Sequence, residues 1–238
     1  MIGALDALLL LALLAVPLSG LLATSRPGRW LLAAGYVAQF SLLAALGSGT
    51  APASALTFDL LGNTVGWRFD SLGWFFAMVT VGAAGFAAAY ASGEWGDAHH
   101  ANGGSLRWLY GGLQINVLAM LLLLSSSDFI SLFIGWELTS WSGLILMLLG
   151  GSEAIRAALR YIVYAIAGGM AVFAGMLVTH AAAGSLQFDV VQGAVASMSS
   201  GQLWAIALLF IAGFSVKMGT MPFHLWQAPA YAFSPVPA

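Results

Sequence analysis

The chain has 238 residues, of which 61% are hydrophobic and only 7% are charged. A soluble domain carries about 25% charged residues, so this chain has too few charges to cover a surface that faces water. Seven Lys and Arg against nine Asp and Glu give a net charge of −2, which excludes the basic field of a nucleic-acid-binding protein. The absence of cysteine excludes disulfides, thiolate metal sites and iron–sulfur ligation. The composition therefore predicts an all-α fold, a polytopic bundle of membrane helices.

Long uncharged runs predict about seven transmembrane helices. A helix needs about 20 apolar residues to cross a hydrocarbon core about 30 Å thick, and the runs do not alternate as the strands of a membrane barrel would. We expect spans near residues 2–24, 30–48, 69–91, 107–127, 129–150, 157–180 and 201–224. This divides the chain into residues 1–50 with the first two helices, an extracytoplasmic loop over 51–68 that forms a short hairpin, and residues 69–238 with helices three to seven.

The arginines predict the orientation, because short cytoplasmic loops carry an excess of Lys and Arg. Five of them fall at the loops of one membrane face: Arg26, Arg29, Arg107, Arg156 and Arg160. We expect this face in the cytoplasm and the N-terminus outside, in an energy-transducing membrane such as the bacterial inner membrane. Within the 92–106 loop, predicted as a solvated turn, the adjacent His99 and His100 cannot both face one metal ion in regular geometry.

Two ionisable residues of opposite sign lie inside predicted spans. Glu137 comes nine residues after Asp128, which places it about 13–14 Å into the membrane at a rise of about 1.5 Å per residue. Lys217 lies toward the end of the seventh span. A charge at this depth costs free energy unless it is paired or hydrated, so such residues face the bundle interior and mark ion pathways.

Pro222 predicts that the seventh helix is broken beside Lys217, because proline leaves a helical carbonyl without its partner and strains the turn before it. Broken helices at membrane depth occur where they are buried in protein or line a wet cavity. If the helical phase continued past the proline, His224 would lie seven residues beyond Lys217 on the same face.

The chemistry that suits this set is a proton relay through Glu137, Lys217 and His224. Desolvation favours the neutral form of an amine and a nearby carboxylate favours the charged form, so movement of the carboxylate relative to the amine loads or unloads a proton. The alternative is a static buried ion pair that only orients two helices.

Several other residues have weaker claims. Arg160 serves either the relay or, as a snorkelling residue, the topology. Asp128 either takes part in the relay or caps a helix N-terminus, as Asp70 does. Ala165 with Gly169, four residues apart, predicts a helix contact face. No hydrolytic, dinucleotide or metal signature appears, so we expect no catalytic residue, no metal and no cofactor in this chain.

Three stretches together resemble a known family. They are residues 125–138 (SSSDFISLFIGWEL), 153–161 (EAIRAALRY) and 217–238 (KMGTMPFHLWQAPAYAFSPVPA), and the likeness extends over about 69–238. They are similar to the proton-translocating antiporter-like subunits of respiratory complex I, of membrane-bound hydrogenases and of Mrp-type Na⁺/H⁺ antiporters. The resemblance implies that Glu137 and Lys217 form the pair at the head of a proton pathway, within a multisubunit complex. Arginine at 160 stands where the family commonly has lysine, and guanidinium does not deprotonate.

The chain also departs from that family, whose members have about fourteen helices with two inverted repeats. These 238 residues stop before helix eight, so we expect them to be the N-terminal half only. The resemblance then implies either a partner membrane subunit that supplies the missing helices and completes a path for protons or Na⁺, or a non-transporting subunit that scaffolds the assembly of a complex.

Overall fold

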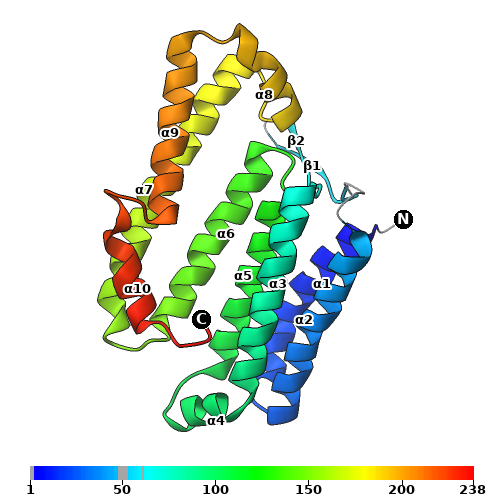
Figure 1. Ribbon diagram of the computed structural model, residues 1–238, viewed down its shortest axis with the longest axis vertical. Coiled ribbons are helices and arrows are strands. Elements are labelled where there is room, and N and C mark those ends of the chain that lie inside the picture. The colour runs from blue at the N-terminus through cyan, green and yellow to red at the C-terminus, as the bar shows by residue number, and fades with distance from the viewer. Residues whose placement is uncertain (1–2, 48–52, 61) are drawn as a thin grey trace.

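The computed structural model describes residues 3–47, 53–60 and 62–238 and confirms the all-α membrane bundle (Figure 1). Seven helices are long and apolar enough to cross a membrane. They are α1 (Ala4–Leu22), α2 (Arg26–Leu46), α3 (Ser71–Ser92), α5 (Leu106–Leu124), α6 (Phe129–Leu148), α7 (Ala154–Ala183) and α9 (Ser200–Met218). Each corresponds to one predicted span; the predicted start at residue 2, the end at 48 and the division at 50/51 lie outside the described residues.

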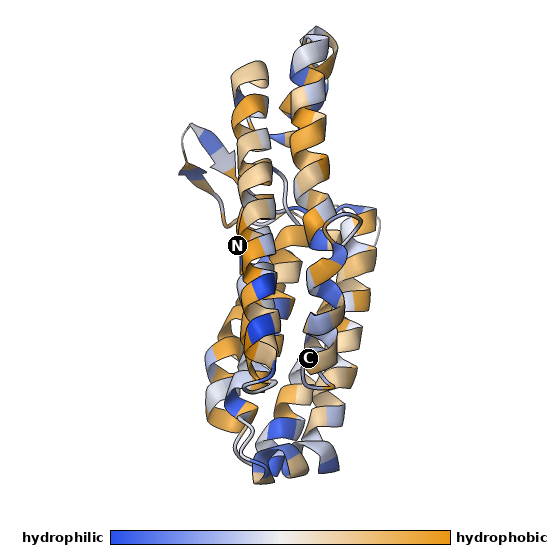
Figure 2. Ribbon diagram, turned by 90° about the vertical axis from the view of Figure 1, so that its left-hand side faces the viewer, coloured by the Kyte–Doolittle hydropathy of each residue, from blue (hydrophilic) through white to orange (hydrophobic). Residues whose placement is uncertain are grey.

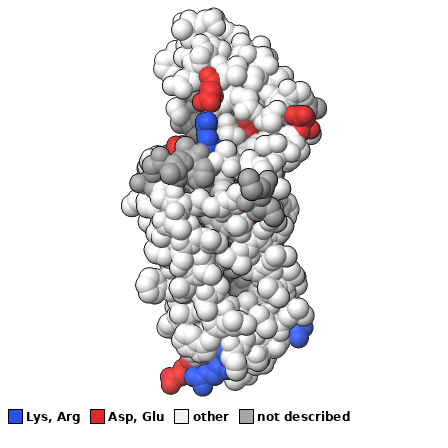
Figure 3. Space-filling model, turned by 90° about the vertical axis from the view of Figure 1, so that its right-hand side faces the viewer, with Lys and Arg blue, Asp and Glu red and all other residues white. Residues whose placement is uncertain are grey.

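The distribution of polar and apolar side chains is that of a protein integral to a membrane. Apolar residues dominate the long helices along most of their length (Figure 2). On the face drawn in Figure 3, the charged side chains form one group in the upper third of the molecule and another near its lower end, and a wide uncharged band separates the two groups. Such a band matches the hydrocarbon layer, in which charged side chains are costly.

Four helices form the first part of the bundle. α1, α2, α3 and α5 pack around one core, whose fully buried side chains include Leu8, Leu43, Val81 and Leu109. α6 packs along α5, and α7 pairs with α9 on the far side of α6 from α1 and α2 (Figure 1). The order places α6 between the four-helix core and the α7–α9 pair.

The predicted hairpin is present as β1 (Phe58–Leu60) and β2 (Asn63–Val65), paired antiparallel with Asp59 opposite Thr64. The segment after β2 is fixed to the bundle because the carboxylate of Asp128 accepts a 3.0 Å hydrogen bond from the backbone N–H of Gly66. The hairpin therefore covers the end of the bundle at which α6 begins.

The prediction of a solvated turn over 92–106 is wrong, because residues Glu94–Ala101 form the helix α4. Two acids in its first turn and two histidines in its last turn suit the helix dipole. The helix is fixed to α2 because the buried guanidinium of Arg29 donates a hydrogen bond to Asp97. The ring of His99 stacks on that of Trp95 with centroids 4.8 Å apart.

The remaining elements are short. They are α8 (Phe188–Ala194), the 3-10 turns η1 (Val195–Ser197) and η2 (His224–Trp226), and α10 (Gln227–Phe233). η2 and α10 follow α9 and return along α7, where α10 also contacts α6. This return closes the space beside the end of α9.

Candidate functional site

The candidate site lies where α6, α7 and α9 meet. Glu137 occupies the ninth position of the 20-residue α6, and Lys217 is the penultimate residue of α9. α9 ends at Met218, and Gly219 follows with a φ of 63°, a left-handed conformation that favours glycine. The expected break of this helix near Pro222 is thus present, directly beside Lys217.

The ammonium of Lys217 is held by a serine on α6. Its Nζ donates a 2.7 Å hydrogen bond to Oγ of Ser140 and lies 5.3 Å from the ring centroid of Trp136, an arrangement that attracts a cation to the ring face. The Ser140 hydroxyl donates in turn to the carbonyl of Trp136 at 3.1 Å. One turn of α6 therefore provides both partners of the ammonium.

The backbone of Ser140 is fixed from α7 as well. The hydroxyl of Tyr161 donates a 3.1 Å hydrogen bond to the carbonyl of Ser140. Tyr161 also packs against the ring of Trp226, with centroids 5.0 Å apart. Ser140 is thus the point at which groups from α6, α7 and α9 converge.

Glu137 turns its carboxylate toward α7. A Cβ atom placed on Gly169 would lie 2.5 Å from Oε1 of Glu137, so only a residue without a side chain leaves room for the carboxylate there. Gly169 belongs to the contact face predicted from its spacing with Ala165. The neighbouring Gly168 instead faces Val216 of α9, at 2.9 Å by the same measure.

Glu137 and Lys217 do not contact each other directly. Among the ion pairs within 4.0 Å in the described residues, none includes either group. Ser140 lies three residues after Glu137 and hence on the same face of α6, so the ammonium sits one turn along α6 from the carboxylate. The structure holds the two opposite charges near each other but apart.

The space beside Lys217 is small and mostly apolar. A void of about 10 Å³ borders Lys217, and a cavity of this size holds at most about one water molecule. Its lining comes from α6, α7, α9 and η2: Trp136, Tyr161, Ala165, Gly168, Val216, Lys217 and Trp226. The indole N–H of Trp226 is fixed by the carbonyl of Val216 at 2.9 Å, so this ring closes the site.

The structure places the other predicted residues away from this void. The helical phase ends at Met218, so His224 is not on the face of Lys217; it begins η2 and is exposed. Arg160 is exposed and donates a 3.5 Å hydrogen bond to the carbonyl of Leu225. Pro222 is exposed in the turn between α9 and η2.

Asp128 caps α6, as its position predicts. Its carboxylate accepts hydrogen bonds from the backbone N–H groups of Ile130 and Ser131, and the residue is fully buried. With the bond from Gly66, it joins the start of α6 to the hairpin. Among the described residues no group of three or more acids and histidines is suited to a metal ion.

Sequence reasoning missed Ser140, Tyr161 and Trp226. Ser140 had a local signal, since it stands one turn from Glu137 on the same face. Trp226 stands in the 217–238 stretch that carries the resemblance, but no local spacing places it beside Lys217, because its approach depends on the chain reversal after Gly219.

Comparison with known proteins agrees with the resemblance drawn from the motifs. Residues 126–238 match the family described as "NADH:quinone oxidoreductase/Mrp antiporter, TM". NADH-quinone oxidoreductase subunit N of Erythrobacter litoralis is 33% identical over 124 residues, which are 50% of this chain and 25% of that protein. Its counterpart in Paraburkholderia phymatum is 34% identical over 130 residues, 51% of this chain and 26% of that protein. The matched stretch thus spans about a quarter of these relatives.

Two solved structures share the fold over almost the whole chain. A chain of the membrane-bound sulfane sulfur reductase, an archaeal respiratory membrane complex, superposes with a TM-score of 0.83 at 19% identity, covering 98% of this chain and 37% of that one. A chain of the Mrp complex from Dietzia sp. gives a TM-score of 0.82 at 21% identity, covering 99% of this chain and 26% of that one. The arrangement of α1 to α10 is therefore a known fold of membrane complexes.

Proposed function

Residues 126–238 belong to the NADH:quinone oxidoreductase/Mrp antiporter family, and on that premise we propose that this chain is an ion-translocating, antiporter-like subunit of a larger membrane complex. The proposed ion is the proton, with Na⁺/H⁺ exchange as the variant that the experiment below distinguishes. The observation that carries the proposal is the hydrogen bond from Lys217 to Ser140, one turn of α6 from Glu137, at the end of a broken membrane helix.

In the proposed relay, Lys217 moves between two partners on one face of α6. While its ammonium donates to Ser140, it is separated from Glu137. Approach of the carboxylate stabilises the charged amine, and withdrawal favours release of its proton, because a nearby opposite charge favours the ionised form. A neutral amine gains a lone pair that can accept a hydrogen bond, so the Ser140 hydroxyl would turn from the Trp136 carbonyl to Lys217.

We assign the rest of the path to helices that these 238 residues do not include. Helices outside these 238 residues would take the proton from Lys217, either directly or through His224, whose exposure allows contact with a partner. The relatives named above are a subunit and chains of complexes, which supports membrane subunits as partners. By the same analogy we assign the chain to a bacterial inner membrane.

The test is ion transport in vesicles that contain the chain with its membrane partners. Acidification is followed with a pH-sensitive dye, with and without a Na⁺ gradient. Glu137→Gln should abolish transport while the complex assembles normally, and the matched control Glu94→Gln, on the exposed α4, should leave transport unchanged. Normal transport in an assembled Glu137→Gln complex would refute the relay; a response to Na⁺ would assign antiport.

A second function, scaffolding without transport, is favoured by one observation, the tight packing around Lys217. A void of about 10 Å³ leaves no room for a chain of waters. If Glu137→Gln or Lys217→Met lowered the yield of the complex and no transport were measurable in the unchanged protein, the scaffold would replace the relay.

The orientation follows the positive-inside rule. We propose that the α4 face, with Arg26, Arg29 and Arg107, lies in the cytoplasm. Because the chain has no cysteine, single cysteines at Ala101 and at Asp59 can be labelled with an impermeant maleimide in intact cells. Labelling of Asp59→Cys alone is expected, and labelling of Ala101→Cys alone would reverse the orientation.

A further inference from the structure

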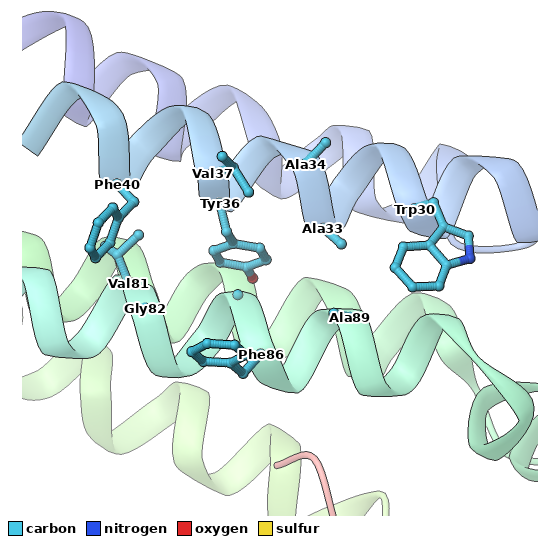
Figure 4. Close-up of a pocket in the computed structure, with 11 residues that line it drawn as sticks. Trp30, Ala33, Ala34, Tyr36, Val37, Phe40, Val81, Gly82, Phe86 and Ala89 are labelled. Carbon is cyan, nitrogen blue, oxygen red and sulfur yellow. The ribbon is translucent and has the colours of Figure 1, made fainter.

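An apolar groove runs between α2 and α3 of the four-helix core (Figure 4). It has a volume of about 450 Å³ and is lined entirely by these two helices. Its floor contains small residues, among them Ala33, Gly82 and Ala89. Nothing in the proposed relay uses this groove.

Aromatic side chains border the groove. Trp30 and Phe40 project from α2 toward α3 at the two ends of the groove, and Phe86 of α3 lies between them (Figure 4). Phe86 is 81% exposed and Trp30 is 50% exposed. These rings lie at the surface of the part of the chain that the structure describes, and the groove that they border has room for a slender apolar ligand.

The length of the groove matches one leaflet of a bilayer. Trp30 and Phe40 are ten residues apart on a continuous helix, which corresponds to about 15 Å along the axis. Half of a hydrocarbon core about 30 Å thick is also about 15 Å. Trp30 lies one turn inside the N-terminal end of α2, where a belt tryptophan is expected. The groove thus extends from the interface to the middle of the membrane.

A cation stands at the interfacial end of the groove. Arg26 precedes Trp30 by four residues and so lies on the same face of α2. Its Nε is 3.8 Å from Asp97, while its side chain is 60% exposed. Asp97 is already hydrogen-bonded to Arg29. Two arginines therefore share one acid, and the guanidinium of Arg26 retains donors for a phosphate.

We propose that this groove binds one acyl chain of a phospholipid from the leaflet on the α4 side, with the lipid phosphate at Arg26. Lipid chemistry accounts for all three features together: an apolar channel one leaflet long, a tryptophan at headgroup depth and an available arginine above it. A partner helix would use the apolar surface but would leave the register of Arg26 and Trp30 unexplained. The proposal does not depend on the relay.

The experiment uses vesicles of phosphatidylethanolamine and phosphatidylglycerol that contain the full chain with its membrane partners. A phosphatidylglycerol with a diazirine in one acyl chain serves as the probe, and labelled peptides are identified by mass spectrometry. We expect labelling of 30–40 and 81–89 to exceed that of α9, whose Trp204 and Leu208 are also exposed. Equal labelling of all exposed helices would overturn the proposal, as would crosslinking of the groove to a partner protein.

Two variants and two controls locate the ligand. A Cβ on Gly82 would meet the Phe40 ring at 3.5 Å, an ordinary contact, so Gly82→Leu fills the groove without a backbone clash and should abolish the labelling. Gly35→Leu adds the same side chain to α2 outside the groove, with no atom within 4 Å of its Cβ, and should retain it.

The second variant, Arg26→Gln, leaves the packing intact and should lower labelling about fivefold, the effect of one surface arginine on an anionic lipid. Arg107→Gln removes an exposed arginine from the same membrane face and should change little. Undiminished labelling in the folded Gly82→Leu protein would refute the groove, and undiminished labelling in Arg26→Gln would refute the phosphate contact.

Discussion

The ammonium of Lys217 is bonded to the hydroxyl of Ser140 rather than to the carboxylate of Glu137. Both α6 residues lie on one face, a turn apart, so a small rearrangement of a flexible lysine exchanges one partner for the other. A buried ion pair would resist such an exchange, because separating it leaves an uncompensated charge. The Ser140 hydroxyl is an uncharged partner that the ammonium can leave without separating an ion pair. A substitution of Ser140 therefore tests the exchange directly.

Ser140→Ala should weaken transport more than it weakens the fold. A hydrogen bond to a charged group contributes about 1.5–3 kcal/mol, and its loss leaves Lys217 free to remain with Glu137. We expect a lowered transport rate and a modest fall in the thermal unfolding midpoint. Ser41→Ala is the control, since the exposed Ser41 donates its hydrogen bond to the carbonyl of Val37 within its own helix. Transport at the normal rate in Ser140→Ala would remove Ser140 from the relay.

Gly169→Ala should displace the Glu137 carboxylate without unfolding the protein. The new Cβ would overlap Oε1 at 2.5 Å, and the end of a flexible side chain can move away. Transport in vesicles should therefore fall while the complex still assembles. Gly35→Ala, on an open helix surface, should raise stability by about 0.5–1 kcal/mol and leave transport unchanged. Unchanged transport in Gly169→Ala would show that the position of the carboxylate is not critical.

The seven spans and two of the helix caps were accessible from the sequence because they depend on local composition. Uncharged runs of membrane length specify the helices, and Asp70 and Asp128 each precede a helix as a capping residue does. α4 was missed because its glycine and polar residues resemble a turn. Its stability comes from the contact between Arg29 and Asp97, 68 residues apart.

The site could be predicted from the sequence only in part, because some of its contacts depend on the tertiary fold and not on local composition. Its two ionisable residues are conspicuous as charges within apolar runs, and Pro222 indicates the break. The direction of the chain after the break depends on the left-handed Gly219 and on packing against α7. That reversal brings Trp226 to Lys217 and leaves His224 exposed.

Asp128→Ala should destabilise the protein by about 0.5–2 kcal/mol through the lost helix cap, with a further loss from the bond to Gly66. Asp128→Asn keeps an acceptor oxygen and should be milder. Thermal unfolding in detergent provides the measurement. Asp59→Ala is the matched control, because that carboxylate is exposed and accepts its hydrogen bond from the neighbouring strand, at Thr64. Equal midpoints for Asp128→Ala and Asp59→Ala would contradict the capping role.

Acid should destabilise α4 over the pH range in which His99 becomes protonated. Burial lowers the pKa of His99 below its ordinary value of 6.5, and His100 adds to the effect. The folded α4 therefore favours neutral His99. The contribution of His99 to the stability of α4 is complete above pH 6.5 and declines as the pH falls below that value. The hydrogen bond from Arg29 holds the pKa of Asp97 below its ordinary 3.8, so Asp97 contributes no change until more acidic pH.

Hydrogen exchange of the amides of residues 94–101 at pH 7.5 and 5.5, corrected for intrinsic rates, measures this opening. We expect weaker protection at pH 5.5 in the unchanged protein and no such difference in His99→Gln, whose side chain does not titrate. His100→Gln should retain the difference, because His100 only assists the shift. If His99→Gln kept the full pH dependence, the loosening would arise from another group, and the burial of His99 would have no role in it.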